Sequence, residues 1–221
     1  MNTVTENRHS LFLLISLILF FVIWPLFHSL PGGELFIDFA FFSLLIAALV
    51  EMANKRGLRR FSIPLVAVII ATVLISHLHP SHGLTVFNYA LVSVFLGFVS
   101  IGLFDYLGKT GPITSGRLYA SASLYFILAV FWGILYNLLN TVFPGSFLEI
   151  GPGPAHTDIH RGTLFYFSIT TLTTLGFGDV LPLTPIARML AALESATGVL
   201  YIAITVARLV AAYQKTNEKV S

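Results

Sequence analysis

The sequence predicts an all-α integral membrane protein, because most of it consists of long apolar segments. Of its 221 residues, 56% are hydrophobic and 10% are charged, a balance typical of membrane-spanning chains and not of soluble domains. About 20 apolar residues in a helix cross a hydrocarbon layer of roughly 30 Å. Six segments approach or exceed that length, and we expect each to form a transmembrane helix: residues 11–30, 35–50, 61–77, 84–104, 118–143 and 184–212.

Two segments need separate treatment. Arg8 precedes the first span, as a basic residue precedes the apolar core of a signal peptide. No small-residue cleavage site follows and the apolar stretch is longer than a signal core, so we expect a retained helix.

Residues 161–172, between the fifth and sixth spans, are apolar but number only 12. That length favours a re-entrant helix, in which the chain enters the membrane and then returns to the same side.

The residues directly after this short segment read Thr173-Thr174-Leu175-Gly176-Phe177-Gly178-Asp179. A row of backbone carbonyls replaces the hydration shell of an ion only where successive carbonyls point to one side of the strand. This requires backbone dihedrals of alternating handedness. Gly176 and Gly178 tolerate positive φ because they have no Cβ, and Thr174 adds a hydroxyl oxygen. The run therefore predicts a strand that coordinates a cation.

The motif with its flanks, residues 166–182, resembles the selectivity filter of potassium channels. The chain resembles small prokaryotic-type members of that pore-loop superfamily, and the resemblance implies that the permeant ion is potassium. It implies an ion-binding set made of Thr174, Leu175, Gly176, Phe177 and Gly178. Since the potassium-channel architecture places four such loops around the ion, it also implies a homotetramer with cyclic symmetry. The fold class is then six transmembrane helices, one re-entrant pore helix and one filter per chain, around a fourfold pore.

The resemblance divides the chain into three parts. We expect a four-helix transmembrane unit over residues 1–110, a pore domain over 111–212 and a short cytoplasmic tail over 213–221. The pore domain then contains an outer helix, the pore helix, the filter and an inner helix. We expect no voltage sensing from the first unit, because residues 84–104 contain no arginine for the membrane field to act on. We expect no cytoplasmic gating domain in the short tail.

Residues around the filter have roles implied by the resemblance. Phe165, Tyr166 and Phe167 occupy positions that brace the filter from behind in the family, although aromatic residues also anchor helices at membrane surfaces. We expect filter support also from Thr170, Thr173 and Asp179. In well-studied members, a pore-helix carboxylate pairs with the aspartate after the filter, and a filter tyrosine bonds to an aromatic cuff. Here Thr170 and Phe177 stand at those positions, so we expect both bonds to be absent or weakened and the filter to act as a gate.

The last apolar segment supplies candidates for a hinge and a cavity. Gly198 lies where many family members have a hinge glycine, but a close contact between helices explains it equally well. Ile202 and Val206, one and two turns further on, are expected to face a cavity that closes by dewetting. Glu194 is an ionisable residue at membrane depth, where such residues are functional by default. We expect it to contact the pore helix of its own or a neighbouring chain, by accepting hydrogen bonds from Thr171 or Ser168, and not to line the ion path.

The basic residues predict the orientation. If both termini are cytoplasmic, ten of the twelve Lys and Arg residues lie on the inner side, as the positive-inside rule requires. The ten are Arg8, Lys55, Arg56, Arg59, Arg60, Lys109, Arg117, Arg208, Lys215 and Lys219. Residues 145–162 and the outer mouth of the filter then lie outside the cell. The prediction is a multi-pass protein of the cell membrane, whose surroundings are the lipid bilayer and potassium ions.

Other function classes have little support. No nucleophile, acid–base pair or phosphate loop suggests an enzyme, no cofactor is implied, and a net charge of +2 is too small to indicate nucleic acid. There are no cysteines, so disulfides and thiolate metal sites are excluded. Two alternatives remain open: a weakly selective cation channel, since Leu175 and Phe177 replace the commonest filter residues, and a non-conducting receptor or scaffold. Five histidines expected outside would be the receptor's binding site: His77, His79, His82, His156 and His160. For the loop that holds His77, His79 and His82, three interpretations stay open: a divalent-metal site, a pH sensor, and an ordinary turn, which Pro80 and Gly83 favour.

Overall fold

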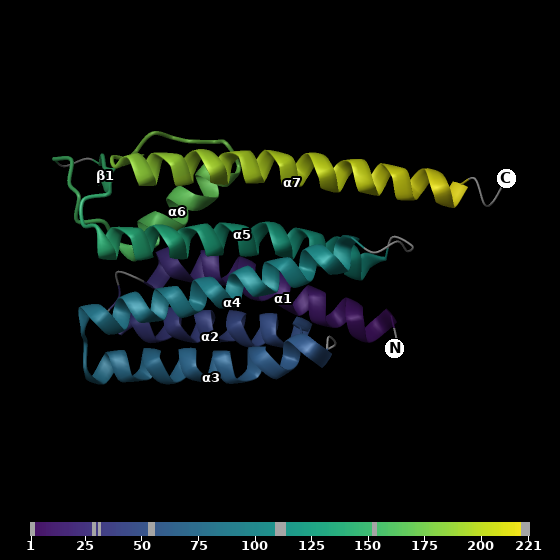
Figure 1. Ribbon diagram of the computed structural model, residues 1–221, viewed down its shortest axis with the longest axis horizontal. Helices are drawn as coiled ribbons and strands as arrows, with labels where there is room; N and C mark the ends of the chain where they lie inside the picture. Colours follow the sequence, from purple (N-terminus) through teal and green to yellow (C-terminus); the bar gives the residue numbers. More distant parts are fainter. Residues whose placement is uncertain are drawn as a thin grey trace. The chain divides into compact units, whose positions relative to one another are not determined.

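The computed structural model describes residues 3–27, 30, 32–52, 56–108, 114–151 and 154–217. In these residues the protein is all-α apart from two strands of three residues each (Figure 1). The helices are α1 (Thr3–Phe27), α2 (Gly33–Met52), α3 (Arg56–Leu78), α4 (His82–Gly108), α5 (Ser115–Val142), α6 (Arg161–Leu172) and α7 (Pro185–Asn217). The strands are β1 (Phe147–Glu149) and β2 (Val180–Pro182).

Each of the six expected spans lies almost entirely in a helix, and the expected re-entrant segment has the same bounds as α6. Among the described residues, four helices contain stretches long and apolar enough to cross a membrane: 7–27 in α1, 82–108 in α4, 115–142 in α5 and 185–208 in α7. This is the pattern of a multi-pass membrane protein. In α3 the apolar stretch, Ser62–Leu78, is shorter, so membrane crossing by α2 and α3 stays a prediction.

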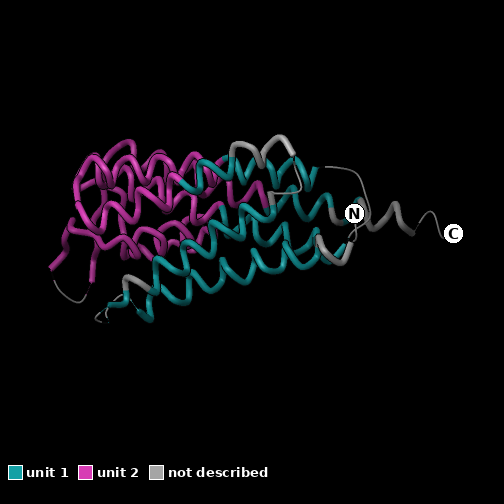
Figure 2. The backbone as a smooth tube through the Cα atoms, turned by 90° about the horizontal axis from the view of Figure 1, so that it is seen from below, with its two compact units in different colours: residues 1–67, 98–127, 202–221 teal, residues 68–97, 128–201 magenta. Residues whose placement is uncertain are grey.

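The described chain forms two compact units, shown in Figure 2. The first contains residues 1–67, 98–127 and 202–221, and the second contains 68–97 and 128–201. Helices α3, α4, α5 and α7 each contribute one part to each unit. These divisions follow contacts along the helices and differ from the expected boundaries at residues 110 and 212, which stay a prediction.

In the first unit, α1 packs against α2 and the beginning of α5. Ser10 Oγ donates to Glu51 Oε1 at 3.0 Å, and Ser123 Oγ donates to the Ser10 carbonyl at 3.4 Å. The rings of Phe21 and Phe126 meet at 6.0 Å between centroids. Hydroxyl hydrogen bonds and aromatic contacts therefore fix α1 between its two neighbours, as expected where helices associate in an apolar medium.

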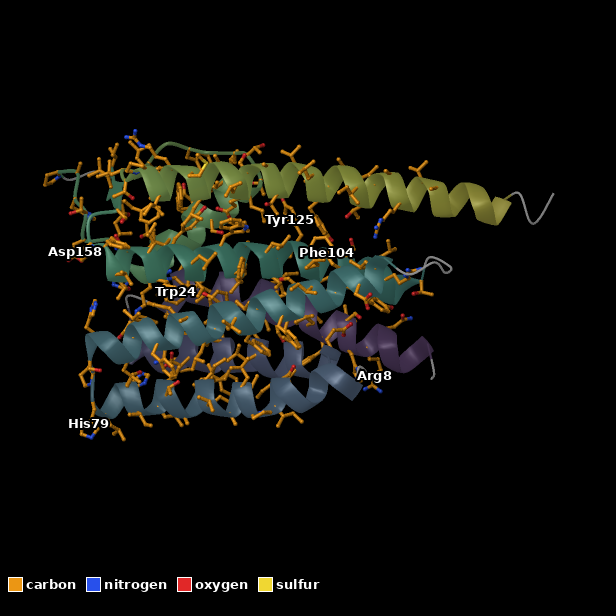
Figure 3. The ribbon with its side chains drawn as sticks, in the orientation of Figure 1. Arg8, Trp24, His79, Phe104, Tyr125 and Asp158 are labelled. Atoms are coloured by element: carbon orange, nitrogen blue, oxygen red, sulfur yellow. The ribbon has the colours of Figure 1, made fainter. Side chains whose placement is uncertain are left out.

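Several of the basic residues used to predict orientation are not described. Lys55, Lys109 and Lys219 lie outside the described residues, and the side chains of Arg56, Arg59, Arg60 and Lys215 lie outside them as well. In the second unit, His79 after α3 and Asp158 before α6 lie at the same end (Figure 3). That both of these loops face the outer side stays a prediction.

The two strands of the second unit pair in an antiparallel ladder that the sequence analysis did not predict. Phe147 lies opposite Pro182, and Glu149 lies opposite Val180. Gly145, with φ of +80°, precedes β1 in the turn after α5, a conformation that glycine adopts without strain. The ladder therefore ties the segment after α5 to the segment that follows the glycine motif.

Three aromatic rings form the centre of the second unit. Tyr136 of α5, Phe147 of β1 and Phe167 of α6 lie 5.1 to 5.5 Å apart between ring centroids. Phe147 and Tyr136 are fully buried, and Phe167 is nearly so. Edge and tilted contacts at this distance are favourable beyond the area they bury. The triangle holds the middle of α6 against α5 and β1.

Candidate functional site

Helix α6 runs antiparallel to α5, starting near its carboxyl end. Asn137 Nδ2 donates to the Arg161 carbonyl at 3.3 Å, and Ser168 Oγ donates to the Ala129 carbonyl at 2.7 Å. From the first contact to the second, α6 advances by seven residues while α5 runs back by eight, so the two helices are antiparallel. Between these contacts, Gly133 lies so close to Phe165 that a Cβ on Gly133 would overlap the phenylalanine ring. The glycine lets the two helices approach closely.

The chain after α6 turns back on the end of that helix. The Thr174 N–H donates to the Thr171 carbonyl at 2.9 Å. The N–H groups of Leu175 and Gly176 both donate to the Thr170 carbonyl, at 2.8 and 3.2 Å. These carbonyls are the ones left without partners at the end of a helix. The inner half of the glycine motif is therefore held by the last turn of α6.

At the other end of the motif, Asp179 meets the ladder of β1 and β2. The Ile150 N–H donates to the Asp179 carbonyl at 2.7 Å, directly next to the Glu149–Val180 pair. Since β1 follows α5 closely, the chain has returned to the end of α5 at which α6 began. Figure 1 shows this return as the segment between the end of α6 and the start of α7. The path is that of a re-entrant loop.

The backbone of the motif alternates in handedness. Positive φ occurs at every second residue: +60° at Thr174, +51° at Gly176 and +80° at Gly178. Within the described chain, Thr174 is the one residue other than glycine with positive φ. A β-branched residue avoids this conformation, and such strained residues cluster at functional sites. Alternation of this kind turns successive carbonyls to the same side, as coordination of a cation requires.

Residues 173–178 are all exposed on the single chain, including Leu175 at 58% and Phe177 at 65%. Large apolar side chains exposed this far mark a surface for another chain or for lipid. The carbonyls and the side chains of one strand cannot surround an ion alone. The exposed strand therefore has the form of one part of a larger ring.

The side chain of Asp179 is held by Tyr166, which the sequence analysis had treated only as an aromatic brace. Tyr166 Oη donates to Asp179 Oδ2 at 2.7 Å. The Tyr166 ring also stacks on Phe177, with centroids 6.3 Å apart and planes 5° apart. Asp179 is therefore braced by Tyr166, and not from positions 170 and 177, where the sequence analysis expected the bonds to be absent or weakened. One tyrosine of α6 makes both a hydroxyl bond and a ring contact to the motif.

The remaining support candidates have local roles in the structure. The Thr170 hydroxyl donates to the Phe167 carbonyl at 3.0 Å, and the Thr173 hydroxyl donates to the Ile169 carbonyl at 2.7 Å. Thr170 therefore makes no carboxylate-like pair with Asp179 across the motif. Phe165 lies against Gly133 of α5, and Phe167 packs on Tyr136 and Phe147, whereas the Tyr166 ring contacts Phe177 of the motif.

Glu194 of α7 lies in a fully buried hydrogen-bond cluster. Tyr136 Oη donates to Glu194 Oε2, and Ser168 Oγ lies at hydrogen-bond distance from Glu194 Oε1, both at 2.5 Å. All three side chains are 0% exposed on the single chain. The contact with Ser168 is one of the two that the sequence analysis named, and Tyr136 is a partner that it missed. We call these three residues the buried cluster.

Gly198 lies one turn after Glu194, at the end of α6. A Cβ on Gly198 would overlap the Leu172 carbonyl oxygen and lie 2.9 Å from its carbonyl carbon. Helix α7 continues through this position without a break. Ile202 and Val206 are 50% and 53% exposed on the single chain, as residues facing a cavity, a neighbouring chain or lipid are. Close contact is thus the feature visible at Gly198, and the hinge stays a prediction.

The histidines that the structure describes give no sign of a metal centre. In the described residues, no group of three or more His, Cys, Asp or Glu side chains is arranged to hold a metal ion. His77 Nδ1 lies 3.0 Å from the Val73 carbonyl of its own helix. His156 pairs through its backbone with Glu149. These contacts account for the two histidines as local structural residues.

Comparison with known proteins points to ion channels. Residues 118–215 match a family described as "Ion channel", a segment that begins in α5 and includes α6, the glycine motif and most of α7. The inward rectifier potassium channel Kirbac3.1 of Paramagnetospirillum magnetotacticum is 29% identical over 103 residues, which are 40% of this chain and 33% of that protein. The chain thus spans about one third of the length of this relative. No solved structure matches the chain.

These matches define the class to which the region is similar. Residues 118–215 are similar to an ion-channel pore domain, and the matched family is one of ion channels and not of enzymes. The match covers the re-entrant path and the alternating backbone described above. Potassium enters the comparison only through the name of one distant relative.

Proposed function

We propose that four copies of this chain form a potassium-selective channel, in which residues 174–178 of each copy line a narrow filter. The observation that carries the proposal is the alternation of positive φ at Thr174, Gly176 and Gly178 on an exposed re-entrant strand. Four such strands around an axis replace the hydration shell of a dehydrated cation with backbone carbonyls. The similarity of residues 118–215 to an ion-channel family supports the same reading.

The direction of α6 favours a cation. Its carboxyl end, at Leu172, lies next to the inner end of the filter, and the carboxyl end of a helix carries partial negative charge. In an apolar layer this field is weakly screened, so it stabilises an ion that has lost part of its water. Conduction through such a filter is passive, because binding in the ring of carbonyls lets the ion enter and leave down its own gradient.

The remaining parts of the proposal follow from the sequence. Residues 1–110 form a four-helix unit, 111–212 the pore domain, and both termini are cytoplasmic, so that the filter opens to the outside. Residues 84–104 contain no arginine, and each charge that crosses the whole field contributes about 2.3 kcal/mol per 100 mV. Without such charges, gating by voltage is weak.

Ion flux into liposomes tests the function. Purified protein is reconstituted, and uptake of rubidium through the channel is measured with potassium or sodium as the competing ion. We expect potassium to compete strongly and sodium to compete weakly. Equal competition by sodium would make the protein a weakly selective cation channel, and no flux from a stable tetramer would favour the receptor or scaffold.

A second expected result concerns the bond between Tyr166 and Asp179. Tyr166→Phe removes the 2.7 Å hydrogen bond and keeps the ring that stacks on Phe177. The loss is about 1 kcal/mol per chain and occurs four times in a tetramer. We expect the variant to conduct in high potassium but to lose flux faster than the parent after external potassium is removed.

Tyr119→Phe is the matched control, because it removes a tyrosine hydroxyl from α5 in the first unit. It should behave like the parent in the same potassium-removal assay. If Tyr166→Phe also behaves like the parent, the Tyr166–Asp179 bond does not stabilise the conducting filter.

A further inference from the structure

Helix α7 contacts α6 closely at two positions that lie one helical turn apart on α7. At the first, Glu194 meets Ser168, and at the second, Gly198 meets the Leu172 carbonyl. Both points lie on the last two turns of α6, immediately before the motif. A shift of α7 along α6 would therefore have to break a hydrogen-bond contact and open a close backbone contact together.

Glu194 has contacts on both other helices of this region. Its two carboxyl oxygens meet Tyr136 of α5 and Ser168 of α6, one oxygen each. Its partners in the described residues are two hydroxyl groups and no cation. A residue that is 0% exposed on the single chain cannot face ions on the axis of an oligomer. Glu194 therefore serves the arrangement of the helices and does not touch the ion path.

Ser168 has a single hydroxyl hydrogen, and this decides which group donates in the contact between Ser168 and Glu194. Ser168 has one hydroxyl hydrogen but two oxygens within reach, the Ala129 carbonyl at 2.7 Å and Glu194 Oε1 at 2.5 Å. Both contacts are hydrogen bonds if Ser168 donates to the carbonyl and accepts from a neutral Glu194. Tyr136 then donates to the other carboxyl oxygen, and every polar atom is satisfied without an unpaired buried charge.

The buried cluster is connected to the motif by the backbone of α6. Ser168 is followed by the residues whose carbonyls hold the motif: the Thr170 carbonyl accepts from Leu175 and Gly176, and the Thr171 carbonyl accepts from Thr174. These bonds lie within three residues of Ser168. A displacement of Ser168 therefore moves the acceptors on which the inner half of the motif is built.

We propose that Glu194, as a neutral acid bonded to Tyr136 and Ser168, is a positioning residue that sets the depth of α6 and thereby keeps the filter in its conducting form. This inference rests on the proposed function, because it concerns the same filter. It assigns to the inner helix a direct hydrogen-bonded connection to the filter support. Movement of α7 and conduction by the filter are then coupled through the buried cluster.

The test compares Glu194→Gln with Glu194→Leu in reconstituted tetramers. The glutamine supplies an N–H in place of the acid O–H and an oxygen for Tyr136, so Glu194→Gln should retain the flux of the parent. Glu194→Leu loses both bonds, and at about 1 kcal/mol for each bond the balance between conducting and collapsed filters shifts by at least about tenfold per chain. We expect its flux to disappear much sooner after removal of external potassium, and to recover slowly on readdition.

If Glu194→Leu does not assemble, Tyr136→Phe tests the proposal in its place. It removes the hydrogen bond to Glu194 and keeps the ring packed against Phe147 and Phe167. Thr197→Val is the control on α7, since the Thr197 hydroxyl donates at 2.7 Å to Leu193 of its own helix. Flux is expressed per assembled tetramer, measured by size-exclusion chromatography, because a merely structural role lowers the yield of tetramer and not the response to potassium.

The outcomes are distinct. Parent-like Glu194→Gln, together with faster loss of flux in Glu194→Leu or Tyr136→Phe, supports the proposal. It is overturned if assembled Glu194→Leu or Tyr136→Phe responds to potassium like Thr197→Val, or if Glu194→Gln is as impaired as Glu194→Leu. Absence of flux in the parent itself contradicts the proposed function first, and this inference with it.

Discussion

Gly176→Ala is expected to abolish potassium flux while leaving the helices of the chain folded. Gly176 has φ of +51°, a conformation in which a residue with a Cβ is destabilised by roughly 1–2 kcal/mol. Alanine would relax toward negative φ and turn the adjacent peptide, so that one carbonyl leaves the ion path. In a tetramer the change occurs four times in one ring, so the conducting form would be displaced almost completely.

Gly145→Ala provides a control with the same backbone strain at another place. Gly145 has φ of +80° and, like Gly176, has no atom within 4 Å of an added Cβ. It lies in the turn before β1, away from residues 173–179. Liposome flux per tetramer should vanish for Gly176→Ala and persist for Gly145→Ala. Persistent selective flux in Gly176→Ala would mean that alternating handedness at Gly176 is not required for conduction.

The sequence predicts the elements of this region well because their signals are local. The length of the apolar segment at 161–172 predicts α6 with its observed bounds, and the two glycines of the motif predict positive φ where it occurs. Thr174 could not be predicted in the same conformation, since threonine avoids positive φ in isolation. Its handedness is imposed by the turn that binds its N–H to Thr171.

The parts that sequence reasoning missed depend on which segments meet in space. Strands β1 and β2 have three residues each, too few for an alternating pattern to be recognised. Tyr136 is a polar residue in an apolar helix, which was a usable signal, but only the packing of α5 against α7 identifies Glu194 as its partner.

The brace that Tyr166 provides was missed for a different reason. The expectation considered only the two positions that carry the bracing groups in well-studied channels, here Thr170 and Phe177. The structure makes the corresponding contacts from Tyr166, one turn earlier on α6 than Thr170. A hydroxyl at one position and a carboxylate at another can satisfy the same aspartate, because a hydrogen bond depends on the location of the donor atom and not on its residue number.

Gly198→Ala is expected to reduce severely the amount of the tetramer that we propose. An added Cβ would overlap the Leu172 carbonyl oxygen and lie 3.2 Å from the Leu172 side chain. The overlapping atom belongs to the backbone at the end of α6, which cannot rotate away as a side chain can. Relief requires α7 to move off α6, and overpacking of this kind destabilises by about 1–3 kcal/mol per chain or more. The measurement is the thermal stability of the tetramer in detergent, followed by size-exclusion chromatography.

Gly97→Ala is the matched helix-glycine control, because its Cβ would lie at an ordinary 3.6 Å from Phe131. Replacing glycine by alanine inside a helix contributes up to about 1 kcal/mol of stability, so this variant should be at least as stable as the parent. The pair also separates the two interpretations of Gly198. If Gly198 is a hinge and makes no close contact, Gly198→Ala should assemble like Gly97→Ala and change only the opening of the pore. Loss of the tetramer in Gly198→Ala alone instead means that glycine is required there because α7 must lie against the end of the helix that supports the filter.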